Sequence, residues 1–283
     1  MLSALSAEAL KLTRHKATWF LVWVYPICIT AIFLLAIGLG LSGVESPSAA
    51  PAPAKWIEET ATIWLVPPHM LGRYLISAYV AVAFAGEYGW NTWKLIVPHR
   101  ARWMLIAAKY LVTVALLYTA YAFSGALTVV LSLVEDSATG DTIPHGITAS
   151  ALIEAHWRGA ATALLPILLT VAYTSLAAVL TRSMVAALVI GIVVATFEQI
   201  FLNFAPLLSA YAPQLVLALF HALPGYHLAN LENWMNQGAA LQSRFPTGAV
   251  VALPLATSLA VTVAWISGLA ALTVASFKRQ DIN

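Results

Sequence analysis

The chain has 283 residues, of which 61% are hydrophobic and only 9% are charged, and its formal net charge is +2. Because soluble domains carry about 25% charged residues, this composition excludes an ordinary soluble protein and indicates an integral membrane protein. The single cysteine, Cys28, lies within an apolar run, which excludes a disulfide framework and a Cys-based metal site. Membrane topology accounts for the basic residues, so nothing in the sequence favours nucleic-acid binding.

The first 18 residues predict an amphipathic helix. Its apolar side chains recur at helical spacing on one face, at Leu2, Leu5, Ala9 and Leu12. Glu8 and Lys11 fall on the opposite face. Such a helix can lie in the membrane interface, or it can be a solvated extension of the first span.

Six segments are long and apolar enough to cross a bilayer, which requires about 20 residues. They are residues 19–41, 64–86, 103–133, 155–180, 184–204 and 248–277. The first is longer than the roughly 7–15-residue apolar core of a signal peptide, so we expect an anchor and not a cleaved leader. Between the last two spans, the apolar segment 205–247 is interrupted by Pro213 and Pro224, and we expect it to be re-entrant or to lie on the outer surface. The predicted fold is thus a single all-α membrane domain over residues 1–283.

The basic residues alternate between the two sides of this arrangement. They precede span 1, lie between spans 2 and 3 and spans 4 and 5, and follow span 6, whereas the loop 135–150 has three acidic residues and no Lys or Arg. Lys and Arg accumulate in cytoplasmic loops. We therefore expect a multi-pass protein of the plasma membrane, in a bacterium the inner membrane, with both termini in the cytoplasm.

The loop between spans 2 and 3 reads "EYGWNTWKLIVPHRARWMLIAAKY", residues 87–110. Gly89 can end the preceding helix, Asn91 and Thr92 can begin a new one, and Pro98 can stop it. The pattern predicts a short helix within residues 88–100 whose exposed side chains include Trp93, Leu95 and Ile96 beside Lys94 and His99. Lys109 is expected to snorkel back to the interface from the next span. The alternative is an ordinary positive-inside loop with interfacial aromatic residues.

The order of residues in this loop resembles the transmembrane subunits of type-2 ABC transporters. The matching positions are Glu87, Gly89, Thr92, Leu95, Pro98, Arg100 and Lys109. The N-terminal "AEALKLTRHKATWF" (7–20) and the layout of six spans with an extended outer segment before the last are similar to that family as well. One departure is visible, because the family usually places Gly directly before Thr, whereas Trp90 and Asn91 intervene here.

The resemblance implies that residues 88–100 form a coupling helix that docks on a separate ATPase subunit. The implied coupling residues are Glu87, Gly89, Thr92, Trp93, Lys94, Leu95, Pro98 and Arg100. It also implies two permease copies, which form the pathway in the lipid membrane, two ATPase copies beneath them, and export of the substrate. The chain has no G-x-x-x-x-G-K-[ST] motif. We therefore expect a non-catalytic subunit without a cofactor, with ATP and Mg²⁺ bound by the partner.

Three ionisable residues, Arg73, Arg158 and Glu198, lie within the predicted spans, where such residues mark functional sites or structural pairs. Their similar depth predicts that Glu198 pairs with Arg73 or Arg158, either as a lock between helices or as a polar element of the transport pathway. Span 5 also has small residues at four-residue spacing: Ala187, Gly191 and Ala195. Such a stripe permits close helix approach, in a dimer contact or within the chain.

Two other classes remain as alternatives. A self-sufficient secondary transporter or channel predicts inverted internal repeats, and none is visible. A membrane-bound transferase or hydrolase would use Glu198 and the outer histidines, but the sequence has neither H-E-x-x-H nor G-x-S-x-G. The outer histidines, whose spacing matches no metal-ligand motif, are His69, His145, His156, His221 and His227. We therefore expect no metal site.

Overall fold

The computed structural model describes residues 1–43, 52–89, 92–246 and 248–281. These residues form eleven α-helices, two 3₁₀ helices and one two-stranded antiparallel hairpin, which confirms the predicted all-α class. The elements in chain order are α1 (Leu2–Arg14), α2 (Lys16–Leu41), α3 (Pro53–Thr60), η1 (Thr62–Leu65), α4 (Met70–Gly89), α5 (Trp93–Ile96), η2 (Val97–His99), α6 (Arg102–Thr139), α7 (Ala149–Thr181), α8 (Met184–Leu208), α9 (Pro213–Ala222), α10 (Pro224–Gln237), β1 (Ser243–Arg244), β2 (Val250–Val251) and α11 (Leu255–Arg279).

Five of the described helices are long and apolar enough to cross a membrane, namely α2, α6, α7, α8 and α11. This supports a multi-pass helical membrane protein. The sixth expected span, 64–86, is divided between η1 and α4, because Pro67 and Pro68 interrupt the helix between them. α4 has 20 residues but includes Arg73 and Glu87, and it is not among the five helices that are long and apolar enough to span.

Two boundaries differ from the prediction. α6 has 38 residues and continues through Glu135 and Asp136, which we had expected in a loop, and it ends at Gly140 in the left-handed conformation. α11 begins at Leu255 and not at Gly248, because residues 250–251 pair with 243–244 in the hairpin. The hairpin itself was not predicted, since two-residue strands leave no periodic signal. The segment 205–247 otherwise consists of the end of α8, α9 and α10.

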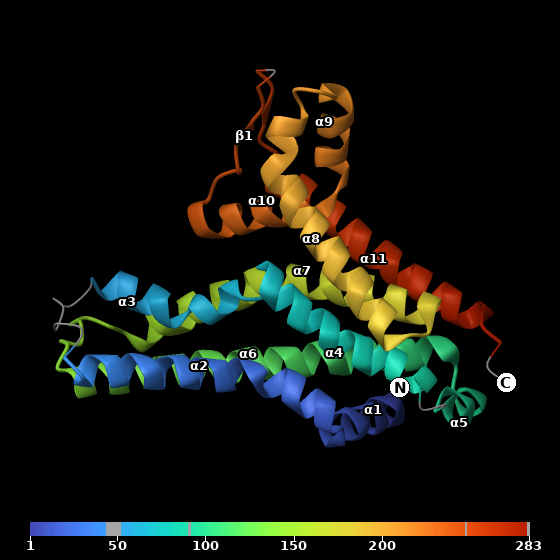
Figure 1. The fold of residues 1–283 in the computed structure, drawn as a ribbon, viewed down its shortest axis with the longest axis horizontal. Helices are drawn as coiled ribbons and strands as arrows, with labels where there is room; N and C mark the ends of the chain where they lie inside the picture. Colours follow the sequence, from blue (N-terminus) through green and yellow to red (C-terminus); the bar gives the residue numbers. More distant parts are fainter. Residues whose placement is uncertain (44–51, 90–91, 247, 282–283) are drawn as a thin grey trace.

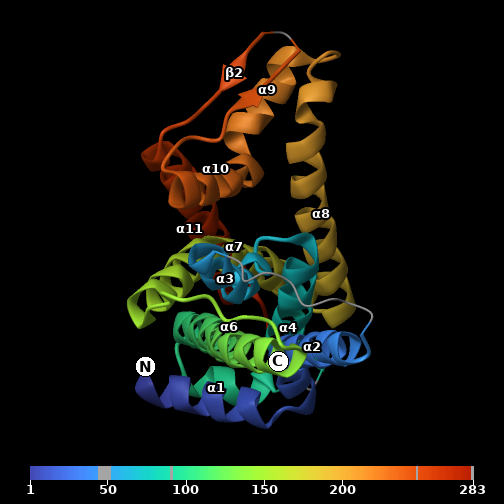
Figure 2. The same ribbon diagram turned by 90° about the vertical axis from the view of Figure 1, so that its left-hand side faces the viewer.

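The helices form two arms that diverge from a common end (Figure 1). α2, α6 and the first part of α7 run along one arm, with α3 near its tip, while α8 and α11 run into the other arm, which α9, α10 and the hairpin complete. Figure 2 shows α10 above the layer of α3 and α7, at the foot of the second arm. α4 packs between the arms, against both α7 and α8.

The main hydrophobic core lies around α4, which other helices surround. Its fully buried side chains include Ile76, Tyr79, Phe84, Ile106 and Leu117. A second, smaller core forms at the tip of the other arm, among α8, α9, α10 and the hairpin. The outer faces of α2, α8 and α11 expose apolar side chains, as expected for helices that face lipid.

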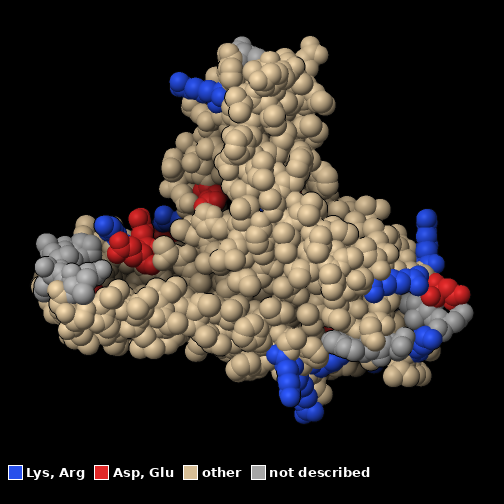
Figure 3. Space-filling view, viewed as in Figure 1, with Lys and Arg blue, Asp and Glu red and all other residues tan. Residues whose placement is uncertain are grey.

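Most basic side chains gather at the common end of the two arms, in a band that runs from beneath α1 to the C-terminus (Figure 3). We call this region the basic end, and it comprises Lys11, Arg14, Lys16, Lys94, Arg100, Arg102, Lys109, Arg182, Lys278 and Arg279. A smaller group of acidic and basic side chains lies on the inner side of the lower arm, toward the foot of the upper one, while the rest of both arms is largely free of charge in this view.

Candidate functional site: an anchored loop at the basic end

The helical part of the connection between α4 and α6 is shorter than the sequence predicts. α4 runs through Gly89, α5 is a single turn over Trp93–Ile96, and η2 follows over Val97–His99. Pro98 lies in the first turn of η2, where its fixed φ is compatible with a helical start. Trp90 and Asn91, including the predicted cap at Asn91, lie outside the described residues.

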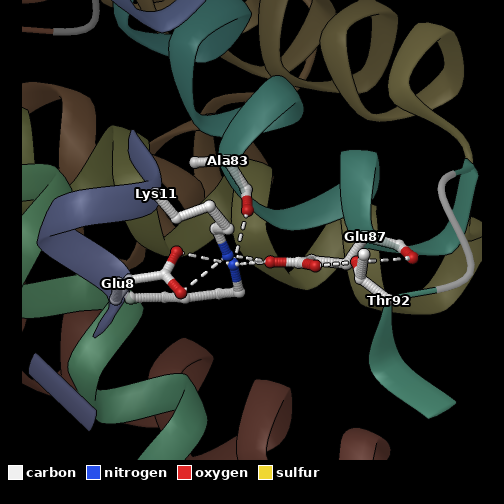
Figure 4. A network of polar contacts seen from close by, with 6 residues as sticks. Glu8, Lys11, Ala83, Glu87 and Thr92 are labelled. Carbon is white, nitrogen blue, oxygen red and sulfur yellow. Dashed lines mark hydrogen bonds and ion pairs between the residues drawn. The ribbon is translucent and has the colours of Figure 1, made fainter. Parts of the chain in front are cut away.

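Figure 4 shows a polar network that includes Glu8, Lys11, Glu87 and Thr92. Lys109, near the start of α6, is buried at its centre. Its Nζ donates to Glu8 Oε1 at 2.7 Å, to Glu87 Oε1 at 2.7 Å and to the Ala83 carbonyl at 2.8 Å. These bonds use all three donors of the ammonium group, and its side chain is 1% exposed. The prediction that Lys109 snorkels to the interface is therefore wrong, because two carboxylates compensate its charge inside the protein.

Lys11 completes the network from α1. Its Nζ donates to Glu8 Oε2 at 2.7 Å and also to Glu87 Oε1. Burial lowers the pKa of Lys11, but the carboxylates of Glu8 and Glu87 outweigh this effect, so its pKa is raised. We call Glu8, Lys11, Glu87 and Lys109 the anchor cluster. Its two positive and two negative charges balance, and it joins α1, α4 and α6.

The loop is attached directly to this cluster. The Thr92 hydroxyl donates to the Glu87 carboxylate, and the Thr92 N–H donates to the Glu87 carbonyl at 3.1 Å. Thr92 makes no side-chain cap bond to α5, so its expected role as a helix cap is replaced by this attachment.

Trp93 points into the protein. It is 2% exposed, and its ring centroid lies 4.4 Å from that of Phe277 and 6.0 Å from that of Tyr88. Lys109 Nζ lies 5.2 Å from the centre of the Trp93 ring, within the range of a cation–π contact. The prediction that Trp93 lies on the exposed side of the loop is wrong, because α11 covers it.

Ile96 and Val97 are half-buried against the main core, so the expected exposure of Ile96 is only partial, whereas five other loop residues are exposed. We call them the exposed loop face, and they are Lys94, Leu95, Pro98, His99 and Arg100. Leu95 is 71% exposed although it is a large apolar residue. An apolar side chain flanked by basic ones, held on a well-packed base, is typical of a surface that binds another protein.

A second set of bonds fixes the far side of the loop. Arg102 Nη1 donates to the carbonyls of Phe277, Lys278 and Gln280 at 3.0, 2.9 and 2.6 Å, and so caps the end of α11. Gln280 in turn accepts a hydrogen bond from Tyr88 Oη at 2.6 Å and donates to the Val179 carbonyl at 2.5 Å. The loop is thus held at both sides by residues from α1, α4, α6, α7 and α11.

A buried ion pair lies deeper in the molecule, where the arms diverge. Arg73 Nη1 lies 2.7 Å from Glu198 Oε2, and both side chains are 4% exposed. Arg73 Nε donates to Thr170 Oγ1 at 3.0 Å, and Tyr173 donates to Glu198. Glu198 therefore pairs with Arg73 and not with Arg158, which lies 2.6 Å from Glu154 on an exposed part of α7.

This ion pair borders a cavity of about 120 Å³ between α4, α8 and α10, whose wall also includes His69 and Glu232. His227, in α10, hydrogen-bonds to Ser258 at 3.0 Å and to the His221 carbonyl at 2.8 Å. Within the described ranges, no three His, Cys, Asp or Glu residues come close enough together to hold a metal ion.

The small-residue stripe of α8 is buried within the chain. Ala187, Gly191 and Ala195 all lie against neighbouring helices. A Cβ on Gly191 would lie 2.7 Å from both Ser77 Oγ of α4 and Thr174 Oγ1 of α7. The stripe therefore lets α8 approach α4 and α7 closely.

The sequence singled out Glu87 and Lys109 but not their partners on α1. Glu8 and Lys11 were read only as the polar face of an interfacial helix. Their three-residue separation was a signal of an ion pair on one helix, but nothing local showed that a second pair would meet it.

Comparison of the chain with protein-family models found no match, and neither did comparison with curated proteins.

Proposed function

We propose that this chain is the transmembrane subunit of a type-2 ABC exporter, with both termini in the cytoplasm and the basic end facing a separate ATPase. Two copies form the pathway, and one ATPase subunit binds the exposed loop face of each. The observation that carries the proposal is the anchored loop, in which an exposed leucine flanked by basic residues is held by bonds to five helices.

Rigid attachment is what energy coupling requires of such a loop. When the ATPase subunits close, a loop that bends would absorb the movement, whereas a fixed loop passes it to the helices. The anchor cluster connects the loop to α1, α4 and α6, and Arg102 with Gln280 connects it to α7 and α11. This arrangement supports a role in transmission, with hydrolysis of ATP left to the partner.

The Arg73–Glu198 pair supports the assignment of a pathway between the arms. It joins α4 to α8 beside the cavity beneath α10. A movement of α4 at the basic end would therefore act directly on this ion pair. In the proposal the pair holds the pathway in one state and parts when the arms move.

Co-purification tests the proposal. The tagged chain is expressed with a candidate ATPase subunit and compared with the triple variant Lys94→Ala, Leu95→Ala, Arg100→Ala. The matched control is Lys278→Ala with Arg279→Ala, which also removes basic charge from the basic end. We expect the ATPase to co-purify with the native chain and the control, and to be lost with the triple variant. Retention of full ATPase binding by a folded triple variant would reject the docking role.

A self-sufficient secondary transporter is the second candidate, because a buried Arg–Glu pair is typical of ion-coupled pathways. It predicts substrate flux into proteoliposomes that contain this chain alone, driven by an ion gradient and unaffected by the triple variant. An exporter subunit predicts flux only with the ATPase and ATP. Chemical turnover of a lipid by the isolated chain would instead support a transferase or hydrolase.

A further inference from the structure

A cavity of about 280 Å³ lies where α1, α2 and α6 meet. Most of its wall is apolar, with Leu12, Trp19, Val22 and Trp23 among the lining residues. Neither the anchor cluster nor the Arg73–Glu198 pair borders it. The cavity lies beside the junction of α1 and α2, at the basic end, where Trp19 exposes much of its ring.

One polar side chain in this wall is left without a partner. Three threonines line the cavity, and two of them use their hydroxyl within their own helix: Thr13 donates to the Ala9 carbonyl and Thr119 to the Ala115 carbonyl, both at 2.8 Å. Thr18 is 1% exposed, and its Oγ1 has no hydrogen-bond partner in the described part of the chain. Because a buried hydroxyl is costly when unpaired, Thr18 favours an occupant that carries an acceptor.

The charges at the rim favour an anion. Arg14 and Lys16 flank the α1–α2 junction, and both are exposed. Lys and Arg side chains project from the underside of the molecule beneath α1, where this junction lies in Figure 1 (Figure 3). Lys11, the other basic residue of α1, is engaged by Glu8 and Glu87. Arg14 directly follows Thr13, and Lys16 lies two residues before Thr18, so both exposed side chains lie close to the cavity wall and can meet an anionic group, while the cavity accepts an apolar chain.

We infer that this cavity is a binding site for one anionic phospholipid from the leaflet at the basic end. An acyl chain lies against the apolar wall, an ester carbonyl accepts a hydrogen bond from Thr18, and the phosphate lies between Arg14 and Lys16. A lipid without net charge would lose part of the attraction at the rim. The bound lipid would pack α1 against α2 and α6, and so would hold Glu8 and Lys11 in the anchor cluster. This inference is independent of the proposed exporter function.

Lipid titration of the full chain tests it. Delipidated protein is titrated in mixed micelles with phosphatidylglycerol or phosphatidylcholine, and binding is followed by the thermal unfolding midpoint from tryptophan fluorescence. The variants are Arg14→Gln with Lys16→Gln, and Thr18→Val, which keeps the shape but removes the hydroxyl. The control is Lys278→Gln with Arg279→Gln. Soluble glycerol 3-phosphate separates lipid binding from binding of free phosphate.

We expect phosphatidylglycerol to stabilise the native chain and the control more than phosphatidylcholine does, and glycerol 3-phosphate to have no effect. Loss of Arg14 and Lys16 should weaken phosphatidylglycerol binding about 30-fold, which corresponds to about 2 kcal/mol for two basic groups. Thr18→Val should weaken both lipids about fivefold, because the ester carbonyl is common to them. Equal stabilisation by the two lipids, or equal losses in the Arg14/Lys16 variant and the control, would overturn the inference. If the Arg14/Lys16 variant does not fold, unchanged lipid binding by Thr18→Val overturns it.

Discussion

Replacement of Lys109 with methionine tests how strongly the anchor cluster joins α1, α4 and α6. Methionine is unbranched and apolar, so it can fill the same space while removing three hydrogen-bond donors and one charge. Glu87, which is 0% exposed, then keeps only Lys11 as a cationic partner, and the Ala83 carbonyl loses its side-chain donor.

The magnitude follows from this geometry. Removal of one partner of a buried ion pair costs about 3–5 kcal/mol when the remaining charge is left alone. Lys11 still neutralises part of the cluster, so we expect Lys109→Met to lower the free energy of unfolding by about 2–3 kcal/mol. Adding Glu87→Gln removes the uncompensated charge. The double variant should therefore lose about 1–2 kcal/mol less free energy of unfolding than the sum of the losses in the two single variants.

The assay is reversible unfolding in detergent micelles, followed by tryptophan fluorescence, for the native chain, both single variants and the double variant. Lys94→Met is the matched control, because Lys94 belongs to the same loop but is exposed, and it should change stability by less than about 0.5 kcal/mol. A Lys109→Met variant as stable as this control, or additive single effects, would refute the argument that the cluster acts as one unit.

Three other predictions follow from the packing. Gly191→Ala should destabilise by about 1–3 kcal/mol, because its Cβ meets two oxygens at 2.7 Å, whereas Gly268→Ala, with nothing within 4 Å, should be neutral or stabilising in the same unfolding assay. Arg73→Met should cost about 3–5 kcal/mol, and adding Glu198→Met should recover most of the loss, which a double-mutant cycle measures. Burial raises the pKa of Glu232 despite the opposing charge of His69, so native stability should fall as pH rises through this raised pKa. Glu232→Gln should therefore be more stable than native at neutral pH, with the difference vanishing below the ordinary glutamate pKa; an equal pH dependence of unfolding in both proteins would contradict this.

The apolar spans could be predicted because each needs only a long run of hydrophobic residues, and the five helices that are long and apolar enough to span contain all or most of their predicted segments. Depth along the helices limited the partner of Glu198 to Arg73 or Arg158, and the structure shows that it is Arg73. α4 was harder to delimit. Two prolines precede it and two charged residues lie within it, so its signal is weaker than that of its neighbours.

The contacts of the loop could not be predicted, because they depend on helices far away in sequence. Trp93 is covered by Phe277 of α11, and Lys109 is neutralised by Glu8 of α1, about 100 residues earlier in the chain. Within the loop itself, Trp93 and Leu95 are equally apolar candidates for burial. Only the placement of α11 decides that Trp93 is buried and Leu95 is exposed.

The length of α6 has a mechanical consequence. Its 38 residues extend about 57 Å, nearly twice the hydrocarbon thickness of about 30 Å. Lys109 fixes the helix near one end, and Asp136 accepts a hydrogen bond at 2.9 Å from Trp56 Nε1 of α3 near the other. These two residues lie about 40 Å apart along the helix axis, so a tilt of about 10° around Lys109 carries α3 through about 7 Å. A rigid tilt of α6 about Lys109 would therefore displace the end that carries Asp136 by more than one helical turn.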